Sequence, residues 1–475
     1  MVGTFTGERL VTEEVHRFTN GPVRTPDGLH WDVLRLFSET LDGLRSARRH
    51  GTIASVGVDT WAVDYGLLDG AGRLLGNPFH YRDRRTDGVR ERVAAIASEA
   101  EQFARTGIAQ LPFNTLYQLA AQVDDDSLIE RAATLLMIPD LLHYWLCGVR
   151  SIERTNASTT GAYGLDGDWA FDLLQRLRIP KQIFGDVIEP GTALDFLRDD
   201  VRRECDLGSV AVVAPATHDT ASAVVAIPAT QAADAARAAF ISSGTWSLLG
   251  LELDRPLATE DARRAGFTNE AGFGGTTRFL TNIMGLWPLQ ECRRAWELRG
   301  RAPPYDEFVT KLAVHRSPGV VFDVDDPALL HPDDMLAAIA AQLRRTGQRA
   351  LEEPLDIARA LLEGLALRYR AALEDAERLA RVRVGTVYVV GGGARNELLC
   401  RLTASACGRT VIAGPFEATA LGNLLVQSIA QHEVSGLAEA REVVRRSIDL
   451  RTYEPESDRA LDESAHRLGE LRRAR

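Results

Sequence analysis

The stretch PATHDTASAV (residues 215–224) places a carboxylate, Asp219, directly after an apolar run that is typical of a buried strand. Two further stretches have the same plan: FISSGTWSLLG (240–250) ends its apolar run in a hydroxyl-rich turn, and VYVVGGGARN (387–396) ends in three glycines. Small residues in such turns let the backbone approach a ligand closely. A carboxylate, a turn suited to phosphate oxygens and a glycine bend suited to a flat base are together the minimum for moving a phosphoryl group onto an alcohol.

Strand-like and helix-like patterns alternate along most of the chain. Short apolar runs at 52–59 and 208–216 predict buried strands, and residues 238–253 predict a hairpin. Residues 354–379 predict a long amphipathic helix, with a proline at its start and apolar residues at helical spacing. This alternation indicates an α/β protein with helices packed on layered sheets.

The length of the chain predicts more than one domain. A sequence of 475 residues is too long for one ordinary core. The Ala/Pro-rich stretch 226–238 is the expected seam between two halves. We therefore predict an N-terminal domain at 1–228, a C-terminal domain at 236–450, and a charged C-terminal tail at 451–475.

The composition argues against several classes of protein. A net charge of −11 disfavours binding to nucleic acid or to an anionic membrane, because surfaces that bind phosphate backbones are basic. No apolar stretch approaches the length of a membrane span, and the sequence shows no signal-peptide pattern. The five cysteines have no C-x-x-C spacing, so neither a disulfide framework nor a zinc site is indicated. We expect a cytoplasmic protein that acts on a small molecule.

Lysine is almost absent from the chain, which contains only Lys181 and Lys311. Neither residue follows a glycine loop, as the lysine of a P-loop does, and neither lies on an early strand beside a Gly-rich loop, as in protein kinases. Both architectures are therefore excluded. Backbone amides and hydroxyl groups must hold the phosphates of any bound nucleotide.

The residues alone leave two interpretations of Asp219 open. It could be a general base that accepts the proton of an attacking hydroxyl, or it could cap the helix that begins TASAVVAI. Its neighbours His218 and Thr220 could contact a ligand or could be ordinary polar residues of a loop. A metal-dependent phosphohydrolase with His218 and Asp219 as ligands would need further ligands at suitable spacing, which the sequence does not offer.

The two turns that suit a nucleotide are ambiguous as well. Thr245 and the neighbouring amides could form an anion-binding turn, but serine, glycine and threonine are also natural in ordinary turns. Glycines 391–393 could open a dinucleotide-binding turn of a dehydrogenase. Against this, Asn396 stands where G-x-G-x-x-G requires its last glycine.

Motifs in order along the chain, from VHRFTNG (15–21) to IAGPFEATALGN (412–423), resemble those of the FGGY-type sugar kinases, which are related to glycerol and xylulose kinases. The matching segments include GVDTWAVDYGLLD (57–69), PFHYRDRRTDG (78–88), LPFNTLYQL (111–119), MIPDLLHYWLCG (137–148), ERTNASTTGAY (153–163), THDTASAV (217–224), SSGTWSLLG (242–250), TNIMGLWPLQE (281–291) and VVGGGARNELL (389–399). So many matches in order are specific. The resemblance implies two actin-like domains, each built on an RNase-H-type sheet, around an interdomain cleft. It implies that the N-terminal domain at 1–228 binds the sugar and that the C-terminal domain at 236–450 binds the nucleotide.

The resemblance also implies a reaction, the ATP-dependent phosphorylation of L-rhamnulose at its 1-hydroxyl, with a related ketose such as fuculose as the alternative substrate. It makes Asp219 the general base. The implied contacts are Ala62, His218, Asp219, Thr220 and Asn282 for the sugar, and Thr245, Gln290 and Gly392 for the nucleotide. Mg²⁺ is expected to arrive with ATP, held by phosphates and waters, so no protein ligand of the metal is predicted.

The sequence departs from the family at two places. Ala62 stands where the family has glycine, which is tolerable if φ is negative there and costly if φ is positive. The chain also begins at the second strand of the family's first domain, without the opening strand and its phosphate loop. We expect a natural chain that starts upstream of Met1. A protein that did start at Met1 would lack an interior strand, and we would expect it to be inactive or a nonenzymatic ligand sensor.

Overall fold

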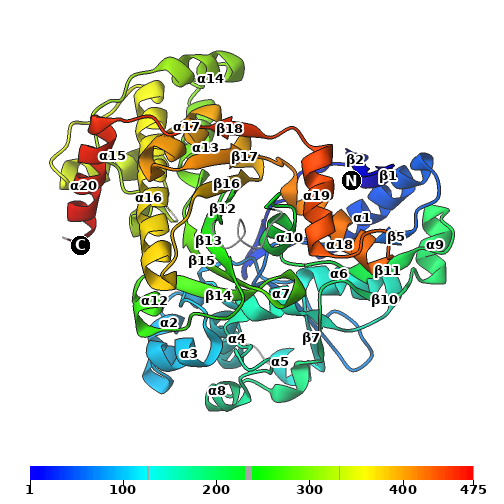
Figure 1. The fold of residues 1–475 in the computed structure, drawn as a ribbon. Coiled ribbons are helices and arrows are strands. Elements are labelled where there is room, and N and C mark those ends of the chain that lie inside the picture. The colour runs from blue at the N-terminus through cyan, green and yellow to red at the C-terminus, as the bar shows by residue number, and fades with distance from the viewer. Residues whose placement is uncertain (126–127, 230–237, 331, 474–475) are drawn as a thin grey trace. The chain divides into compact units, whose positions relative to one another are not determined.

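A computed structural model of the protein describes residues 1–125, 128–229, 238–330 and 332–473 (Figure 1). The chain folds into two compact units. Unit 1 comprises Met1–Thr230, Glu252–Phe279 and Ala418–Ser447, and unit 2 comprises Gln231–Leu251, Leu280–Glu417 and Ile448–Arg475.

The units interleave along the sequence, whereas the predicted domains were consecutive. Segments 252–279 and 418–447 pack with the N-terminal half of the chain, which local sequence patterns could not reveal. The predicted domain limits stay a prediction. Most of the predicted seam, residues 230–237, lies outside the described residues. The predicted charged tail contains a strand, β18 (Arg451–Tyr453), and a helix, α20 (Arg459–Arg473).

Unit 1 contains short sheets surrounded by helices. Its strands are β1 (Val2–Thr6), β2 (Arg9–Glu13), β3 (Val23–Thr25), β4 (Gly28–His30), β5 (Ser55–Val56), β6 (Tyr65–Leu68), β7 (Thr134–Met137), β8 (Ile152–Glu153), β9 (Val187–Ile188), β10 (Thr192–Phe196), β11 (Ala211–Ala214) and β14 (Phe267–Ala271). Its helices are α1 (Val33–Ala47), α2 (Val89–Ile96), α3 (Glu99–Thr106), α4 (Thr115–Asp125), α5 (Leu128–Arg131), α6 (Ile138–Cys147), α7 (Arg154–Ala157), α8 (Phe171–Arg176), α9 (Asp199–Cys205), α10 (Asp219–Val225), α12 (Glu260–Arg264), α18 (Ala418–Ala430) and α19 (Leu437–Ser447).

The sheet that leads to Asp219 has the order β10-β11-β5. Strand β11 pairs antiparallel with β10 and parallel with β5. Of the strand predicted at 52–59, only Ser55–Val56 is regular, because among the described residues β5 has a partner on one side alone. Strand β11 is apolar and almost fully buried, as the run at 208–216 predicted. It delivers the chain directly to helix α10, whose first residue is Asp219.

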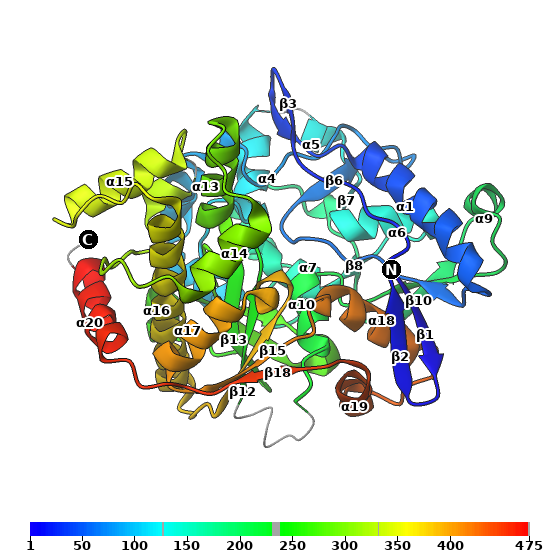
Figure 2. The same cartoon turned by 90° about the horizontal axis from the view of Figure 1, so that it is seen from above.

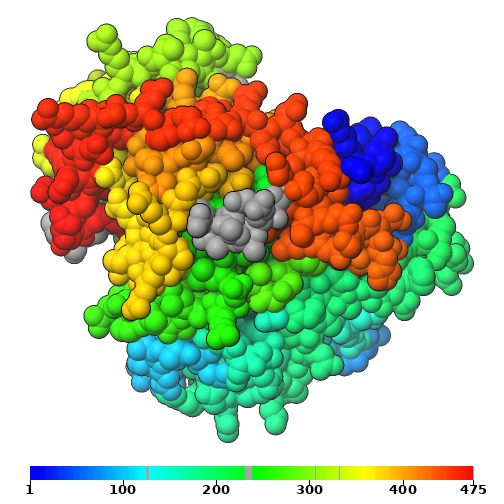
Figure 3. Space-filling model, viewed as in Figure 1, coloured from blue at the N-terminus to red at the C-terminus, as the bar shows by residue number. Residues whose placement is uncertain are grey.

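The two ends of unit 1's sequence lie side by side. The hairpin β1–β2 forms a separate two-stranded sheet that packs on α19 (Figure 2). The Leu10 amide donates to Ser447 Oγ at 2.9 Å, and Arg446 pairs with Glu8 at 2.7 Å. Figure 3 shows this contact as the dark blue surface of the first residues against the red-orange surface of α18 and α19.

A groove of about 670 Å³ runs through unit 1 between β1 and the segment that leads through β5 to Asp59. Helices α1 and α18 contribute to its lining, including Leu44 and Leu424. The described residues place no strand between β1 and β5.

A larger sheet has the order β14-β15-β13-β12-β16-β17-β18 among the described residues, and most of its strands belong to unit 2, whereas β14 belongs to unit 1. The division between the units runs through two of these strands, β13 and β15. The strands not yet given are β12 (Ala238–Ser243), β13 (Ser247–Leu253), β15 (Thr277–Ile283), β16 (Thr386–Val390) and β17 (Thr410–Ala413). The helices are α13 (Trp287–Leu298), α14 (Tyr305–Val314), α15 (Met335–Arg345), α16 (Pro354–Ala380) and α17 (Glu397–Cys407).

Two predictions for unit 2 are confirmed. Strands β12 and β13 form the expected antiparallel hairpin, and β12 pairs in parallel with β16, the strand before the three glycines. Helix α16 starts at Pro354 and ends where Arg381 takes the left-handed conformation. It buries a long apolar stripe and packs against α17 and α20 (Figure 2). Among the described residues, no helix combines the length and the apolarity that crossing a membrane requires.

Candidate functional site

Two loops of unit 1 meet at the carboxyl ends of β5 and β11. The Thr60 amide donates to the Thr217 carbonyl at 3.0 Å, and the Asp219 amide donates to the Thr60 carbonyl at 2.9 Å. Thr60 and His218 thereby form a parallel bridge that continues the β5–β11 pairing beyond the regular strands. Because neighbouring parallel strands end at the same edge of a sheet, this pairing brings the loop after β5 alongside Asp219.

A buried carboxylate, Glu153, holds the loop that carries Asp219. Glu153 is 0% exposed. It accepts hydrogen bonds from the amide and hydroxyl of Thr155 at 2.7 and 2.5 Å, and from the amide and hydroxyl of Thr217 at 2.8 Å each. Burial raises the pKa of Glu153, and these four donors oppose the rise. A charged acceptor with four donors fixes the backbone just before Asp219.

The carboxylate of Asp219 is half-exposed, and its two oxygens differ. Oδ1 accepts the Thr220 amide at 2.5 Å and the Thr220 hydroxyl at 3.1 Å, and His218 Nε2 lies 3.3 Å away. Within the described part of the chain, no donor lies on Oδ2. Helix α10 begins at Asp219 itself, and its cap residue, His218, makes no side-chain capping bond. A capping carboxylate would accept an amide two or three residues further on, so the structure does not support the capping interpretation.

His218 and Thr220, both predicted sugar contacts, are buried beside Asp219. They are 6% and 3% exposed, and both direct polar atoms at the Asp219 carboxylate. The structure therefore brings these three predicted residues together. Their contacts with a sugar stay a prediction.

Asp59 is a functional candidate that the predicted site residues did not include. Asn423 of α18 donates to its carboxylate, and a second bond from Asn423 to the Gly57 carbonyl holds the same loop. Burial raises the pKa of Asp59 to about 6, and the nearby charge of Asp219 adds to the rise. Its position at the end of the predicted strand 52–59 was the only signal in the sequence.

Ala62 lies in a tight turn, and its methyl group is tolerated. The Asp64 amide donates to the Ala62 carbonyl at 2.9 Å, which closes a γ-turn with Val63 at its centre. The left-handed conformation falls on Val63, at φ 68°, and not on Ala62. A β-branched residue in this region is strained by about 1–3 kcal/mol. Alanine is tolerated at position 62 because its φ is not positive. The strained, left-handed residue is the next one, Val63.

Asp64 holds this strained turn in place. Its Oδ2 accepts the indole N–H groups of Trp31 at 2.6 Å and Trp61 at 3.0 Å and the Tyr81 amide at 3.2 Å. Its Oδ1 accepts the Gln118 amide at 2.9 Å. Burial raises the pKa of Asp64 to about 6 although all four donors act against the rise. The two tryptophans are therefore bound to the carboxylate, and the loop that carries Ala62 has one defined shape.

In unit 2, the structure brings two of the predicted nucleotide contacts together. Thr245 lies in the exposed bend of the β12–β13 hairpin, and its hydroxyl donates to Gln290 Oε1 at 3.1 Å. The amides of Leu286 and Trp287, at the start of α13, donate to the carbonyls of Gly244 and Thr245. These bonds attach the first turn of α13, including Gln290, to the bend.

The third predicted nucleotide contact, Gly392, borders open space. A Cβ at Gly393 would lie 2.0 Å from Ser243 Oγ, so the glycine turn packs tightly on the end of β12. A Cβ at Gly392 would have no atom within 4 Å. Gly392 is therefore exposed on a side where a flat ring could lie against the backbone. Asn282, predicted to contact the sugar, lies near the end of β15 and belongs to unit 2 with these residues.

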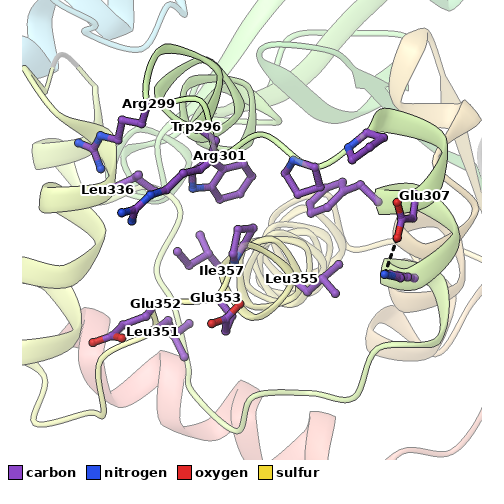
Figure 4. A pocket seen from close by; sticks show the side chains of 15 residues that line it. Trp296, Arg299, Arg301, Glu307, Leu336, Leu351, Glu352, Glu353, Leu355 and Ile357 are labelled. Atoms are coloured by element: carbon purple, nitrogen blue, oxygen red, sulfur yellow. Dashed lines mark ion pairs between the residues drawn. The ribbon is translucent and has the colours of Figure 1, made fainter.

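A cavity of about 690 Å³ elsewhere in unit 2 contains none of the predicted residues (Figure 4). It is lined by Trp296 and by residues of both charges, among them Arg301 and Glu353. Lys311 and Glu307 pair with each other at 2.5 Å in its wall. Its charges are mixed, so it does not have the character of a phosphate site.

The chain is similar to known proteins over almost its whole length. Models of the FGGY family of carbohydrate kinases match residues 24–226 with their N-terminal domain and residues 239–431 with their C-terminal domain. The chain is 38% identical over 465 residues to a rhamnulokinase of Bacteroides thetaiotaomicron, covering 97% of this chain and 94% of that protein. It is 39% identical over 460 residues to a rhamnulokinase of Oceanobacillus iheyensis, covering 95% of each.

Solved structures are similar in fold. A gluconate kinase from Lactobacillus acidophilus superposes with a TM-score of 0.80 at 15% identity, covering 98% of this chain and 94% of that one. A Plasmodium falciparum glycerol kinase with ADP gives a TM-score of 0.76 at 14% identity, covering 96% and 92%. At such identities the likeness concerns the fold alone. It confirms the α/β sugar-kinase fold that the sequence predicted.

Proposed function

Because the chain belongs to the FGGY family of carbohydrate kinases, we propose that it transfers the γ-phosphoryl group of ATP to the 1-hydroxyl of L-rhamnulose. The observation that carries this proposal is the Asp219 carboxylate, half-exposed at the start of α10 with Oδ2 free of donors among the described residues. The rhamnulokinases similar to this chain over nearly its whole length support L-rhamnulose as the sugar.

In the proposed reaction, Asp219 Oδ2 accepts the proton of the 1-hydroxyl while that oxygen attacks the γ-phosphorus. General-base catalysis of this kind contributes roughly 10²–10⁴-fold to the rate. Glu153 and the Thr60 backbone hold the loop, so the carboxylate does not need to reorganise when the sugar binds. His218, Thr220, Ala62 and Asn282 are the proposed contacts of the other sugar groups.

ATP is proposed to bind in unit 2 against the glycine turn and the hairpin bend. Gly392 would lie against the adenosine, while Thr245 and Gln290 would contact the phosphates and their surroundings. In the part of the chain that the structure describes, no group of three or more His, Cys, Asp or Glu side chains could hold a metal ion. We propose that Mg²⁺ enters with ATP as part of the substrate, coordinated by phosphate oxygens and waters. The cytoplasm is the proposed compartment.

A coupled assay of ADP release tests the substrate. With saturating MgATP and a panel of L-rhamnulose, L-fuculose, D-xylulose, glycerol and gluconate, we expect the highest kcat/KM for L-rhamnulose. Product analysis should place the phosphate on the 1-hydroxyl. Faster turnover of L-fuculose would identify fuculose, and not rhamnulose, as the substrate. Binding of L-rhamnulose and ATP without ADP release would contradict the kinase function.

Replacing Gly392 by valine tests the nucleotide site. The side chain would fill space that is open in the structure, so the fold should be retained. We expect the KM for ATP to rise at least about tenfold, since a branched side chain would lie where the base stacks and 1.4 kcal/mol of lost binding is a factor of ten. The KM for L-rhamnulose should stay unchanged. An unchanged KM for ATP would remove Gly392 from the site.

A further inference from the structure

A buried ion pair lies next to His218 in unit 1. Arg278 of β15 is 0% exposed, and Glu270 of the neighbouring strand β14 is 6% exposed (Figure 1). Arg278 Nη1 lies 3.0 Å from Glu270 Oε2, and Arg278 Nε donates to the Ala271 carbonyl at 2.9 Å. A charge inside an apolar strand requires such partners, because an unpaired buried ion is very costly.

Stability alone is a weak explanation for this pair. Removing two charges from water costs several kcal/mol per ion, and replacing a buried pair by apolar residues is often neutral or stabilising. Burial lowers the pKa of Arg278, and the charge of Glu270 opposes that shift. Although burial acts in the other direction, Arg278 holds the pKa of Glu270 below its ordinary value. Each charge keeps the other ionised, so a charged donor is maintained next to the imidazole.

The guanidinium determines which nitrogen of His218 carries the proton. Arg278 Nη2 lies at hydrogen-bond distance from His218 Nδ1, at 3.2 Å, and Glu270 Oε2 lies further from the same nitrogen, at 3.4 Å. Arginine nitrogens can only donate, so the contact at 3.2 Å is a hydrogen bond only when Nδ1 accepts, that is, when it carries no proton. A neutral imidazole with a bare Nδ1 has its proton on Nε2. Nε2 lies 3.3 Å from Asp219 Oδ1, so in this tautomer its proton lies beside the carboxylate.

This tautomer explains the asymmetry of the Asp219 carboxylate. Oδ1 accepts hydrogen bonds from the amide and hydroxyl of Thr220, and His218 Nε2 lies 3.3 Å from the same oxygen. Oδ2 is left as the oxygen that can accept the proton of the sugar. In the opposite tautomer, a bare Nε2 would face a carboxylate oxygen and repel it, and the carboxylate would turn or bind a proton.

We propose that Arg278 and Glu270 are positioning residues for phosphoryl transfer: Arg278 fixes His218 as the Nε2–H tautomer, and this donor orients the Asp219 carboxylate with Oδ2 free. Glu270 makes the arrangement possible by neutralising Arg278. The proposal rests on the function proposed above, because it assigns a role in the same proton transfer.

Three variants separate this role from a purely structural one. Arg278→Met removes the donor, Arg278→Lys keeps a charged donor, and the double variant Glu270→Gln with Arg278→Met removes both charges. The double variant leaves no unpaired ion in the interior, so it should fold and melt close to the parent protein. We expect its kcat to fall about 10- to 100-fold with an unchanged KM for ATP, because an incorrectly held base loses part of the roughly 10²–10⁴-fold that it contributes.

The kcat of Arg278→Lys should be at least tenfold higher than the kcat of Arg278→Met. A double variant that folds and has the parent kcat would overturn the proposal. So would a loss of kcat in Arg278→Lys equal to that in Arg278→Met, since the lysine restores the donor. If the single variants failed to fold, the kcat of the double variant alone would test the proposal.

The tautomer can be measured without any turnover. With ¹⁵N-labelled histidine, and His218→Gln to assign the signal, NMR should show a protonated Nε2 and an unprotonated Nδ1 in the parent protein. The double variant should show loss of that single tautomer. A protonated Nδ1 in the parent protein would refute the assignment. If L-rhamnulose were not phosphorylated but the tautomer were as expected, the substrate proposal alone would fail.

Discussion

Replacing Asp219 by asparagine should lower kcat for L-rhamnulose at least a hundredfold, within the roughly 10²–10⁴-fold that a general base contributes. The asparagine amide oxygen can still accept the amide and hydroxyl of Thr220, which bind Oδ1 in the parent protein. Its NH₂ group then occupies the position of Oδ2 and cannot accept the proton of the hydroxyl. The KM values for sugar and ATP should change by less than about threefold, because binding does not require this proton transfer.

Asp261→Asn is the matched control for this substitution. Asp261 is an exposed aspartate of the same unit, at the start of the short helix α12. The same loss of a negative charge there should leave kcat at the parent value. Single-turnover measurements with Asp219→Asn would separate chemistry from product release. A kcat within tenfold of the parent protein would remove Asp219 as the general base.

Replacing Gly422 by alanine should destabilise the protein by about 3 kcal/mol, the upper end of ordinary overpacking costs. Gly422 lies in α18, which packs against α10. A Cβ there would lie 1.8 Å from the carbonyl oxygen of Ser222 and 2.5 Å from its carbon. These are backbone atoms of a fully buried residue and cannot rotate away. One of the two helices must move.

The displacement should also affect catalysis, because α10 begins at Asp219 and the Thr419 hydroxyl of α18 donates to the Asp219 carbonyl at 3.2 Å. Urea unfolding followed by tryptophan fluorescence measures the loss of stability. The kcat of the folded protein measures the effect of displacing Asp219.

Gly43→Ala provides the control for Gly422→Ala. Gly43 lies inside α1 of the same unit, and a Cβ there would approach no atom closer than 3.9 Å. Alanine at that position should be neutral or stabilising by about 0.5–1 kcal/mol, because it reduces the backbone entropy lost on folding. If the two alanines had equal effects, close packing between α10 and α18 would not be the cause.

Much of the fold followed from short-range patterns in the chain. Apolar runs that end in small residues predicted β11, the β12–β13 hairpin and the strand before the glycine turn. The helical period predicted α16 with its first residue. These features depend on the period of the side chains and on which residues tolerate a turn, and both are visible within a short window of sequence.

The candidate site was predicted in part. Asp219, His218 and Thr220 are adjacent in the sequence, so their proximity required no tertiary information. Thr245 and Gln290 are 45 residues apart, and their contact at 3.1 Å joins two motifs that only the family resemblance had connected.

The γ-turn at Val63 escaped prediction. Its left-handed conformation is supported by Asp64, whose carboxylate is held in turn by donors from distant segments, Trp31 and Gln118. Asp59 was missed for a similar reason, because the residue that holds it, Asn423, lies 364 positions away.

The identity of the reactive groups was thus already present in the linear order of residues, whereas their electrostatic state was not. Glu153 holds Thr217 across 64 positions, Arg278 reaches His218 across 60, and Thr419 reaches the Asp219 carbonyl across 200. Burial, hydrogen-bond partners and the state of a proton depend on which distant segments pack together, and no local pattern encodes that choice.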